Sequence, residues 1–213
     1  KKRKIFIDKK YTEYLDGKRN ELSIIRKSQR DIMLENLIDI NTCIGYIYKK
    51  GLNFWDKRND QSDFLTLRLG IGNAPLEIDI SYQEEDFKID ESNLKNKADQ
   101  LIKEFKYVEN TPIGYSFFEN TVTAVMGISK KVIPFVNNLI IQLLTFYSYE
   151  DLKIVVFTSN KNKIDFEYIK YLNHSFSNDK LFRFFACDYE TSKIVSDILL
   201  QEINHRIFSM SSN

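Results

Sequence analysis

The chain has 213 residues, of which 43% are hydrophobic and 29% are charged, and its formal net charge is +1. This length suits one large domain or one domain with an appendage, and the near-neutral charge argues against nucleic acid as a partner. The two cysteines, Cys43 and Cys187, have neither a metal-binding spacing nor the number of a disulfide framework, so they indicate a reducing compartment.

The apolar runs of the sequence are short. None reaches the roughly 20 residues that a membrane-spanning helix needs, and no apolar stretch of a secretory signal follows the basic residues 1–4. Because the sequence begins without Met, we expect it to be a piece of a longer protein.

Residues 1–50 are predicted to be helical. Apolar residues recur on one helical face, and a second helical pattern continues over residues 32–48. The first face is formed by Tyr11, Leu15, Leu22, Ile25 and Ile32. Residues 1–31 hold eleven Lys or Arg and five Asp or Glu, and a solvated helix face is the favoured interpretation. The alternative is a segment just inside an anionic membrane leaflet, where each Lys or Arg contributes about 1 kcal/mol.

Two amphipathic strands are predicted next, over residues 65–69 and 76–82, because apolar and polar residues alternate in both. Gly70 and Gly72 are expected to end the first strand in a turn between the two. This turn is not a phosphate loop, because no helical pattern follows it. Trp55, which precedes the strands, could be a ligand platform, but a core or interface aromatic residue is the favoured interpretation.

Strands and helices alternate in the rest of the chain. A helix over residues 94–105 and a short strand over 115–118 come before a βαβ unit. That unit comprises a strand (121–126), a turn (127–131), a buried helix (132–147) and a second strand (152–157). A short helix (165–172), a strand (181–186) and a last helix follow. The buried stripe of the last helix is predicted to comprise Ile194, Val195, Ile198, Leu199, Ile203 and Ile207. The sequence therefore predicts an α/β fold with a mostly parallel sheet covered by helices on both faces.

The turn of the βαβ unit occupies the place of a phosphate-binding loop. Counted from Gly127, a Walker-type loop requires Gly at 132, Lys at 133 and Ser or Thr at 134, where this chain has Val132, Ile133 and Pro134. The candidate, degenerate loop comprises Gly127, Ile128, Ser129, Lys130 and Lys131. A helix start with two lysines could hold an anion weakly, but a solvated turn is the favoured interpretation.

No other catalytic arrangement is recognisable in the sequence. The strand that ends at Phe157 is followed by Thr158 and Ser159, so the carboxylate that holds Mg²⁺ in nucleotide motors is missing there. No Ser/His/Asp or Cys/His spacing is present, and His174 is expected to have a turn or hydrogen-bonding role. We therefore predict no catalytic residue and no metal site.

Several segments resemble the membrane-bound secretion ATPases of type VII secretion systems, called EssC, YukB or EccC, of the FtsK/SpoIIIE group. Residues 54–75 are similar to the pattern L-W-[ED]-R-R … D-F-L-x-x-R-L-G-x-G … P of that family. Residues 168–174 are similar to W-x-K-W-L-P-H, with Asn173 in place of Pro, and residues 142–152 and the helix around Tyr14 also match. The family signature is carried by Trp55, Asp56, Arg58, Asp63, Arg68, Gly70, Gly72, Pro75 and His174.

This resemblance implies a place in a larger machine. Residues 1–50 would form a helical juxtamembrane stalk, and residues 51–213 a P-loop-ATPase-like, Rossmann-like domain with a degenerate nucleotide site. The segment would lie at the cytoplasmic face of the membrane, before further ATPase domains of the same chain that bind ATP and Mg²⁺, and no cofactor is expected here. Its implied partners are those domains, membrane subunits of the secretion complex and copies of itself in a homo-hexameric ring.

The leading hypothesis is a non-catalytic coupling and interaction domain between the membrane assembly and the downstream motor domains. One alternative is a weakly active or nucleotide-sensing ATPase domain that uses Lys130 or Lys131 to bind phosphate. A third hypothesis, a DNA-translocating module, is disfavoured by the near-neutral charge.

Overall fold

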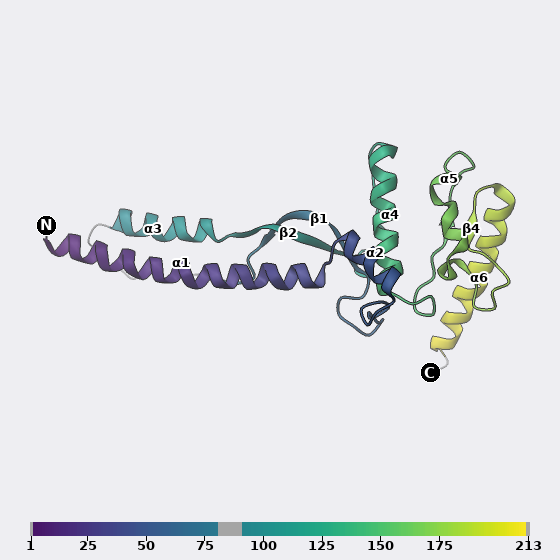
Figure 1. Ribbon diagram of the computed structural model, residues 1–213, viewed down its shortest axis with the longest axis horizontal. Helices are drawn as coiled ribbons and strands as arrows, with labels where there is room; N and C mark the ends of the chain where they lie inside the picture. The colour runs from purple at the N-terminus through teal and green to yellow at the C-terminus, as the bar shows by residue number, and fades with distance from the viewer. Residues whose placement is uncertain (1, 81–90, 212–213) are drawn as a thin grey trace. The chain divides into compact units, whose positions relative to one another are not determined.

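The structure is a computed structural model that describes residues 2–80 and 91–211 (Figure 1). The chain folds into two compact units, Lys1–Asp39 with Thr66–Thr121, and Ile40–Leu65 with Val122–Asn213. The expected division into residues 1–50 and 51–213 does not coincide with these units. Each unit is assembled from two separate stretches of the chain, because elements far apart in sequence pack on one another.

Unit 1 is a long helix packed along a second helix and a two-stranded sheet. Its elements are α1 (Lys2–Asn36), β1 (Thr66–Pro75), α3 (Glu91–Glu104) and β2 (Tyr107–Ser116). Strands β1 and β2 are antiparallel, and α1 runs beside α3 and β2 (Figure 1). The core contains Leu15, Leu22, Leu76, Leu101, Phe105 and Val108. Helix formation in α1 and α3 is confirmed.

The glycines of β1 lie inside the strand, so the prediction that they end it is wrong. The register of β1 against β2 shifts between Arg68 and Gly70 and again between Gly72 and Ala74. These shifts are bulge-like irregularities, and the two strands stay paired on both sides of each. A Cβ at Gly72 would come within 2.9 Å of Ile113 Cγ1, so a side chain at this position would disturb the cross-strand contact.

The second predicted strand is not formed over its described part, residues 76–80, and residues 81–82 lie outside the described residues. The apolar residues of this stretch instead pack into the unit 1 core, where Leu76 is buried and Ile80 lies against the cluster. Of the strand predicted over residues 115–118, residues 115–116 form the end of the longer strand β2, whereas residues 117–118 lie in the turn after it.

Unit 2 is built around α4 and a short parallel strand pair. Its helices are α2 (Ile40–Lys49), α4 (Ser129–Phe146), α5 (Lys163–Phe166) and α6 (Tyr189–Ser211), with 3₁₀ turns η1 (Glu167–Tyr171) and η2 (Asn173–Ser175). Strands β3 (Val156–Phe157) and β4 (Phe185–Ala186) pair in parallel.

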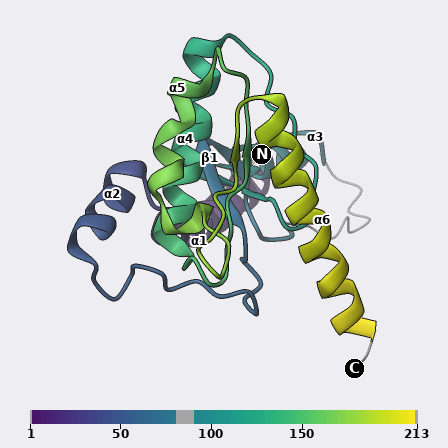
Figure 2. The same cartoon turned by 90° about the vertical axis from the view of Figure 1, so that its right-hand side faces the viewer.

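Helices cover both faces of this strand pair, as the sequence predicted. Ile154 and Val156 cluster with residues of α4, whereas Val155 clusters with residues of α6, as expected from the two-residue period of a strand. In Figure 2 the extended segments run between α4 and α6. The mixture of helices and small sheets fits the α/β class, while the larger P-loop-ATPase-like sheet stays a prediction.

The first strand of the predicted βαβ unit is absent, so that prediction is wrong for residues 121–126. Val122 and Met126 are 93% and 91% exposed, and a strand needs a neighbouring strand to pair with. The strands predicted over 152–157 and 181–186 are each reduced to two residues.

The buried stripe predicted for α6 is only partly confirmed. Val195 is buried, and Ile198 and Leu199 pack against the same cluster, but Ile203 and Ile207 are exposed, as is Ile194. No helix in the part of the chain that the structure describes is long and apolar enough to cross a membrane.

Candidate functional site

The loop that precedes α4 was the candidate phosphate site. Ile128 has an extended backbone and precedes the first helical residue, Ser129, and its carbonyl accepts the N–H groups of Lys131 and Val132. Lys130 and Lys131 are exposed in the first turn of the helix. This loop has the geometry of an ordinary helix start, and after Gly127 it lacks the second glycine of a nucleotide-binding loop.

Gly127 lies close to the helix that follows. A Cβ at this position would come within 3.1 Å of Val132 Cγ2, so the loop packs against the Val132 side chain. A Walker loop has its second glycine at the position of Val132. Ile133 and Pro134 follow, so the helix has neither the lysine nor the hydroxyl of a Walker loop at these two positions.

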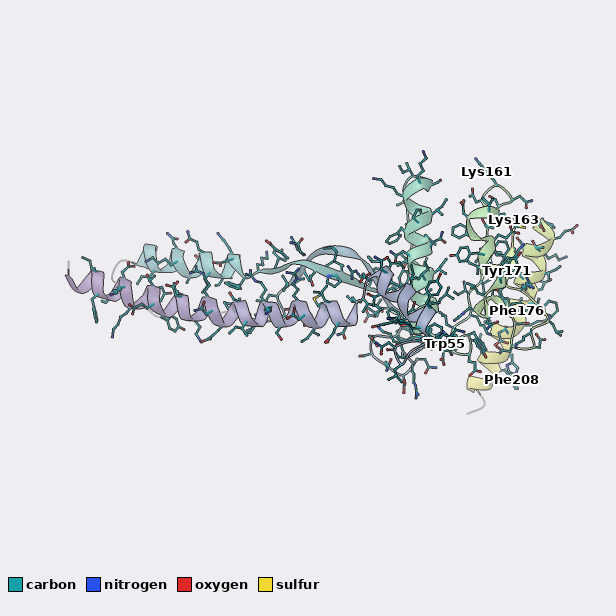
Figure 3. All side chains as sticks on the ribbon, in the orientation of Figure 1. Trp55, Lys161, Lys163, Tyr171, Phe176 and Phe208 are labelled. Atoms are coloured by element: carbon teal, nitrogen blue, oxygen red, sulfur yellow. The ribbon has the colours of Figure 1, made fainter. Side chains whose placement is uncertain are left out.

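Two of the signature residues, Trp55 and His174, lie at the opposite end of α4. The last four carbonyl groups of a helix have no partner within the helix, and here each is paired. The Tyr147 N–H donates to Leu143 O at 3.0 Å, and the Trp55 indole Nε1–H donates to Leu144 O at 3.1 Å. The main-chain N–H groups of Trp55 and Lys57 donate to Thr145 O and Phe146 O, at 2.8 and 3.2 Å. Figure 3 labels Trp55 at this end of the helix.

We call residues 54–65, together with Tyr147, Tyr149 and His174, the α4 clasp. Trp55 is its centre, and its backbone has a φ of 60°, a left-handed conformation that costs a residue with a side chain roughly 1–2 kcal/mol. The indole stacks on Phe54 with ring centroids 4.5 Å apart and meets Tyr149 and His174 edge to face. These contacts and two hydrogen bonds to α4 offset the backbone strain.

Tyr147 joins the clasp to the end of α4. Its side chain is fully buried, and its hydroxyl accepts the Leu65 N–H at 2.7 Å. Burial raises the pKa of Tyr147 to about 12, with smaller upward contributions from Asp63 and Asp56 against the Leu65 hydrogen bond. The phenol is therefore neutral at physiological pH and acts as a structural acceptor.

His174 links the end of α4 to Ile154, in the segment that leads into β3. It is 4% exposed, and its Nε2 lies 2.9 Å from Tyr147 O, which can only accept, so Nε2 carries the proton. The carbonyl of His174 accepts the Ile154 N–H at 2.9 Å. Burial lowers the pKa of His174, and the charge of Lys153 adds to this, while the hydrogen bond to Tyr147 acts in the opposite direction.

The charged members of the clasp are less buried. Lys57 Nζ forms an ion pair with Asp63 at 2.5 Å and lies over the Phe146 ring. Partial burial raises the pKa of Asp56, partly against a backbone hydrogen bond and the Lys57 charge. Asp56 and Arg58 are exposed, so these two signature residues are available at the surface.

The remaining signature residues lie in unit 1 and also have structural contacts. The Arg68 guanidinium donates to Leu37 O at 2.9 Å, and Gly70 and Gly72 flank the register shifts of β1. Pro75 O accepts the Gln29 side-chain amide at 2.9 Å, and the amide oxygen of Gln29 accepts the Glu77 N–H. The structure therefore places Trp55, Asp56, Arg58, Asp63 and His174 in one unit and Arg68, Gly70, Gly72 and Pro75 in the other.

Sequence reasoning gave no role to the buried hydroxyl of Tyr147 or to the carbonyls that Trp55 caps. One signal was present: no glycine or asparagine follows α4 to provide the usual helix end, so its carbonyls needed partners from elsewhere. Among the residues described, no group of three His, Cys, Asp or Glu could hold a metal ion.

A groove with a volume of about 820 Å³ lies between α6 and residues 177–184 of unit 2. Its lining is mixed, with Phe182 and Ile198 beside Asp179 and Glu202. Glu202 is paired with Arg206 at 2.7 Å, and none of the site residues predicted from the sequence lines this groove.

Comparison with known proteins finds similar proteins that are all named as type VII or ESX secretion proteins. No family model matches the chain. The type VII secretion system protein EssC of Staphylococcus aureus is 25% identical over 200 residues, which are 94% of this chain and 14% of that protein. The ESX secretion system protein EccC of Geobacillus thermodenitrificans is 24% identical over 165 residues, 77% of this chain and 11% of that protein. The chain thus spans a small fraction of the length of these relatives, and over that span it is a homologue of the type VII secretion proteins EssC and EccC.

Proposed function

We propose that this chain acts in type VII secretion as a non-catalytic, ATPase-like coupling and interaction domain. It would connect a membrane assembly to downstream ATPase domains of the same protein. Homology to EssC and EccC along most of the chain supports the secretion role. Its partners would be those domains, membrane subunits and copies of itself in a hexameric ring at the cytoplasmic face, with ATP and Mg²⁺ bound downstream.

The α4 clasp is the observation that carries this proposal. In the aromatic signature residues Trp55 and His174, the indole Nε1 and the imidazole Nε2 are bonded to main-chain carbonyls, which are not reacting groups. Their contacts tie three separate pieces of unit 2 together at one end of α4. A domain that transmits force or position needs such a rigid joint, whereas catalysis needs titratable groups that face a substrate.

The start of α4 supports the non-catalytic part of the proposal. A nucleotide motor contacts phosphate and Mg²⁺ through the Gly, Lys and Ser or Thr that close its Walker loop. At the corresponding positions this chain has Val132, Ile133 and Pro134, whose side chains have no hydrogen-bond donor. The exposed Asp56 and Arg58 offer opposite charges on the outside of the clasp, where a neighbouring domain could bind.

A second candidate function is nucleotide sensing. Its specific support is the pair of exposed lysines, Lys130 and Lys131, in the first turn of an 18-residue helix. A helix start with two cations could hold the phosphates of a nucleotide without Mg²⁺ chemistry.

Export assays in the cell separate the two functions. The gene would be changed to Trp55→Ala in one strain and to Lys130→Ala with Lys131→Ala in another, and small secreted proteins in the medium would be measured. The coupling function predicts that export falls with Trp55→Ala and stays at the wild-type level with the double lysine change. Immunoblots that show equal amounts of protein provide the control for stability.

Loss of export in the lysine strain at normal protein abundance would favour the sensing function. A phosphate-release assay on the purified chain adds a second readout. Hydrolysis that the wild-type chain supports and the lysine variant does not would contradict the non-catalytic proposal.

A further inference from the structure

Leu65 has a backbone conformation that is unusual for a leucine. Its φ is 56°, in the left-handed region, which is unfavourable for a residue with a Cβ and is adopted readily by glycine. Leu65 ends the first stretch of unit 2, and the chain continues from it into β1 at Thr66. The conformation of this one residue therefore sets the direction in which the chain leaves unit 2.

Tyr147 holds Leu65 in this conformation. The Leu65 N–H donates to the Tyr147 hydroxyl at 2.7 Å, and the ring of Phe64 meets the Tyr147 ring edge to face, with centroids 5.3 Å apart. Tyr147 is itself fixed, because its side chain is fully buried, its N–H donates to Leu143 O and its carbonyl oxygen is bonded to His174. The strained residue is thus tied to a rigid point at the end of α4.

Ordered structure on both sides of Leu65 concentrates any change of direction at this residue. The Phe64 N–H donates to Gln61 O at 3.1 Å, and Thr66 pairs with Ser116 in the ladder of β1 and β2. Because both neighbours are held by hydrogen bonds within their own stretches, a rotation about the Leu65 backbone bonds redirects the chain there. Residues at the ends of elements act as hinges in this way.

We propose that Leu65 and Tyr147 form a conformational latch, in which loss of the hydrogen bond lets Leu65 relax from the left-handed to an extended conformation. The strain of a left-handed leucine and the net stabilisation by a single hydrogen bond are similar in size. The held and released states are therefore close in free energy, which is what a two-state element requires. The latch deepens the proposed coupling function, and its use in secretion rests on that function.

Glycine and alanine at position 65 measure the strain. Both changes remove the leucine side chain, but only glycine adopts the left-handed conformation freely, so Leu65→Gly should unfold at a higher urea concentration than Leu65→Ala. Ile164→Gly and Ile164→Ala are the matched pair, at a residue of α5 that is 82% exposed. There the alanine variant should be the more stable. A more stable alanine variant at position 65 as well would overturn the latch.

Amide hydrogen exchange of the purified chain measures the release. Tyr147→Phe keeps the ring and removes the hydroxyl, so exchange of the Leu65 N–H should become about tenfold faster or more. The Ile154 N–H, which is bonded to His174 O, is the internal reference and should exchange at a rate much closer to that of wild type. Tyr149→Phe is the matched control, because it removes a hydroxyl from the other tyrosine of the clasp and leaves the acceptor of Leu65 in place.

An unchanged rate at Leu65 in Tyr147→Phe would overturn the proposal. So would an equal acceleration at Ile154, since the clasp would then loosen as a whole, or an equal acceleration at Leu65 in Tyr149→Phe.

Export by a strain with Tyr147→Phe separates the latch from the coupling function. With both correct, the Leu65 N–H exchanges faster in the purified variant and export falls at normal protein abundance. Faster exchange with wild-type export would support the latch and contradict a coupling role for it.

Discussion

Trp55 shows how one residue can determine the end of a helix far from it in sequence. Its side chain and its main chain pair with Leu144 O and Thr145 O, although 89 positions separate it from Leu144. Helix α4 has no terminal glycine, so without the indole the carbonyl of Leu144 would lose its partner. This physical role accounts for a tryptophan in a left-handed backbone conformation.

Replacement of Trp55 by Phe should destabilise unit 2. The ring and its stacking are largely kept, but Leu144 O loses the indole donor, which we expect to lower the free energy of unfolding by about 1–2 kcal/mol. Because Trp55 is the single tryptophan, urea denaturation should be followed by circular dichroism. Leu52→Ala, at a residue that is 98% exposed, should change stability by less than about 0.5 kcal/mol.

His174 makes the clasp sensitive to acid. Because its pKa is lowered from the ordinary 6.5 in the folded state, the unfolded chain binds more protons once the pH falls below that value. The stabilisation is therefore full above about pH 6.5 and is lost as the pH falls further. The free energy of unfolding, measured from about pH 7 to about pH 5, should decrease in wild type.

His174→Gln isolates this contribution, since its amide can donate to Tyr147 O without titrating. The decrease toward pH 5 should be smaller in this variant than in wild type. His205→Gln, at an exposed residue of α6, is the control and should retain the wild-type profile. Equal slopes in wild type and His174→Gln would contradict the role assigned to His174.

At the scale of elements, the sequence predicted helices better than strands. The spacing of apolar residues correctly predicted α3, α4 and the packed part of α6. A helix forms its backbone hydrogen bonds within itself, and the residues of its core-facing side recur in the sequence with the period of the helix. Residues 121–126 had the composition of a strand but form none, because strand formation depends on a neighbour that the local sequence does not specify. The capping of α4 was missed for the same reason, as it depends on a long-range contact.

The packing of α4 on the strand segment can be tested at Ile154. This residue is 9% exposed and clusters with Ile140 and Ile169, so Ile154→Ala should lower the free energy of unfolding by roughly 2–4 kcal/mol. Ile164→Ala removes the same atoms from a residue that is 82% exposed and should cost less than about 0.5 kcal/mol. Similar losses in the two variants, measured by urea denaturation, would exclude the assigned core.

At the scale of the whole molecule, the signature segment of residues 54–75 is divided between two units. Trp55 and Asp63 belong to the unit that contains α4, and Arg68 and Pro75 to the unit that contains α1. The sequence could indicate which residues matter through their resemblance to a family, but not this division, because unit boundaries follow from contacts between distant stretches. The segment therefore has structural contacts in both units.

Isothermal titration of the chain with Mg-ATP and Mg-ADP, at protein concentrations near a millimolar, tests the central claim most directly. The account predicts no saturable heat, because Val132, Ile133 and Pro134 replace the residues that hold phosphate and Mg²⁺. A one-site binding curve that disappears in Lys130→Ala with Lys131→Ala would contradict it and establish a nucleotide-binding domain.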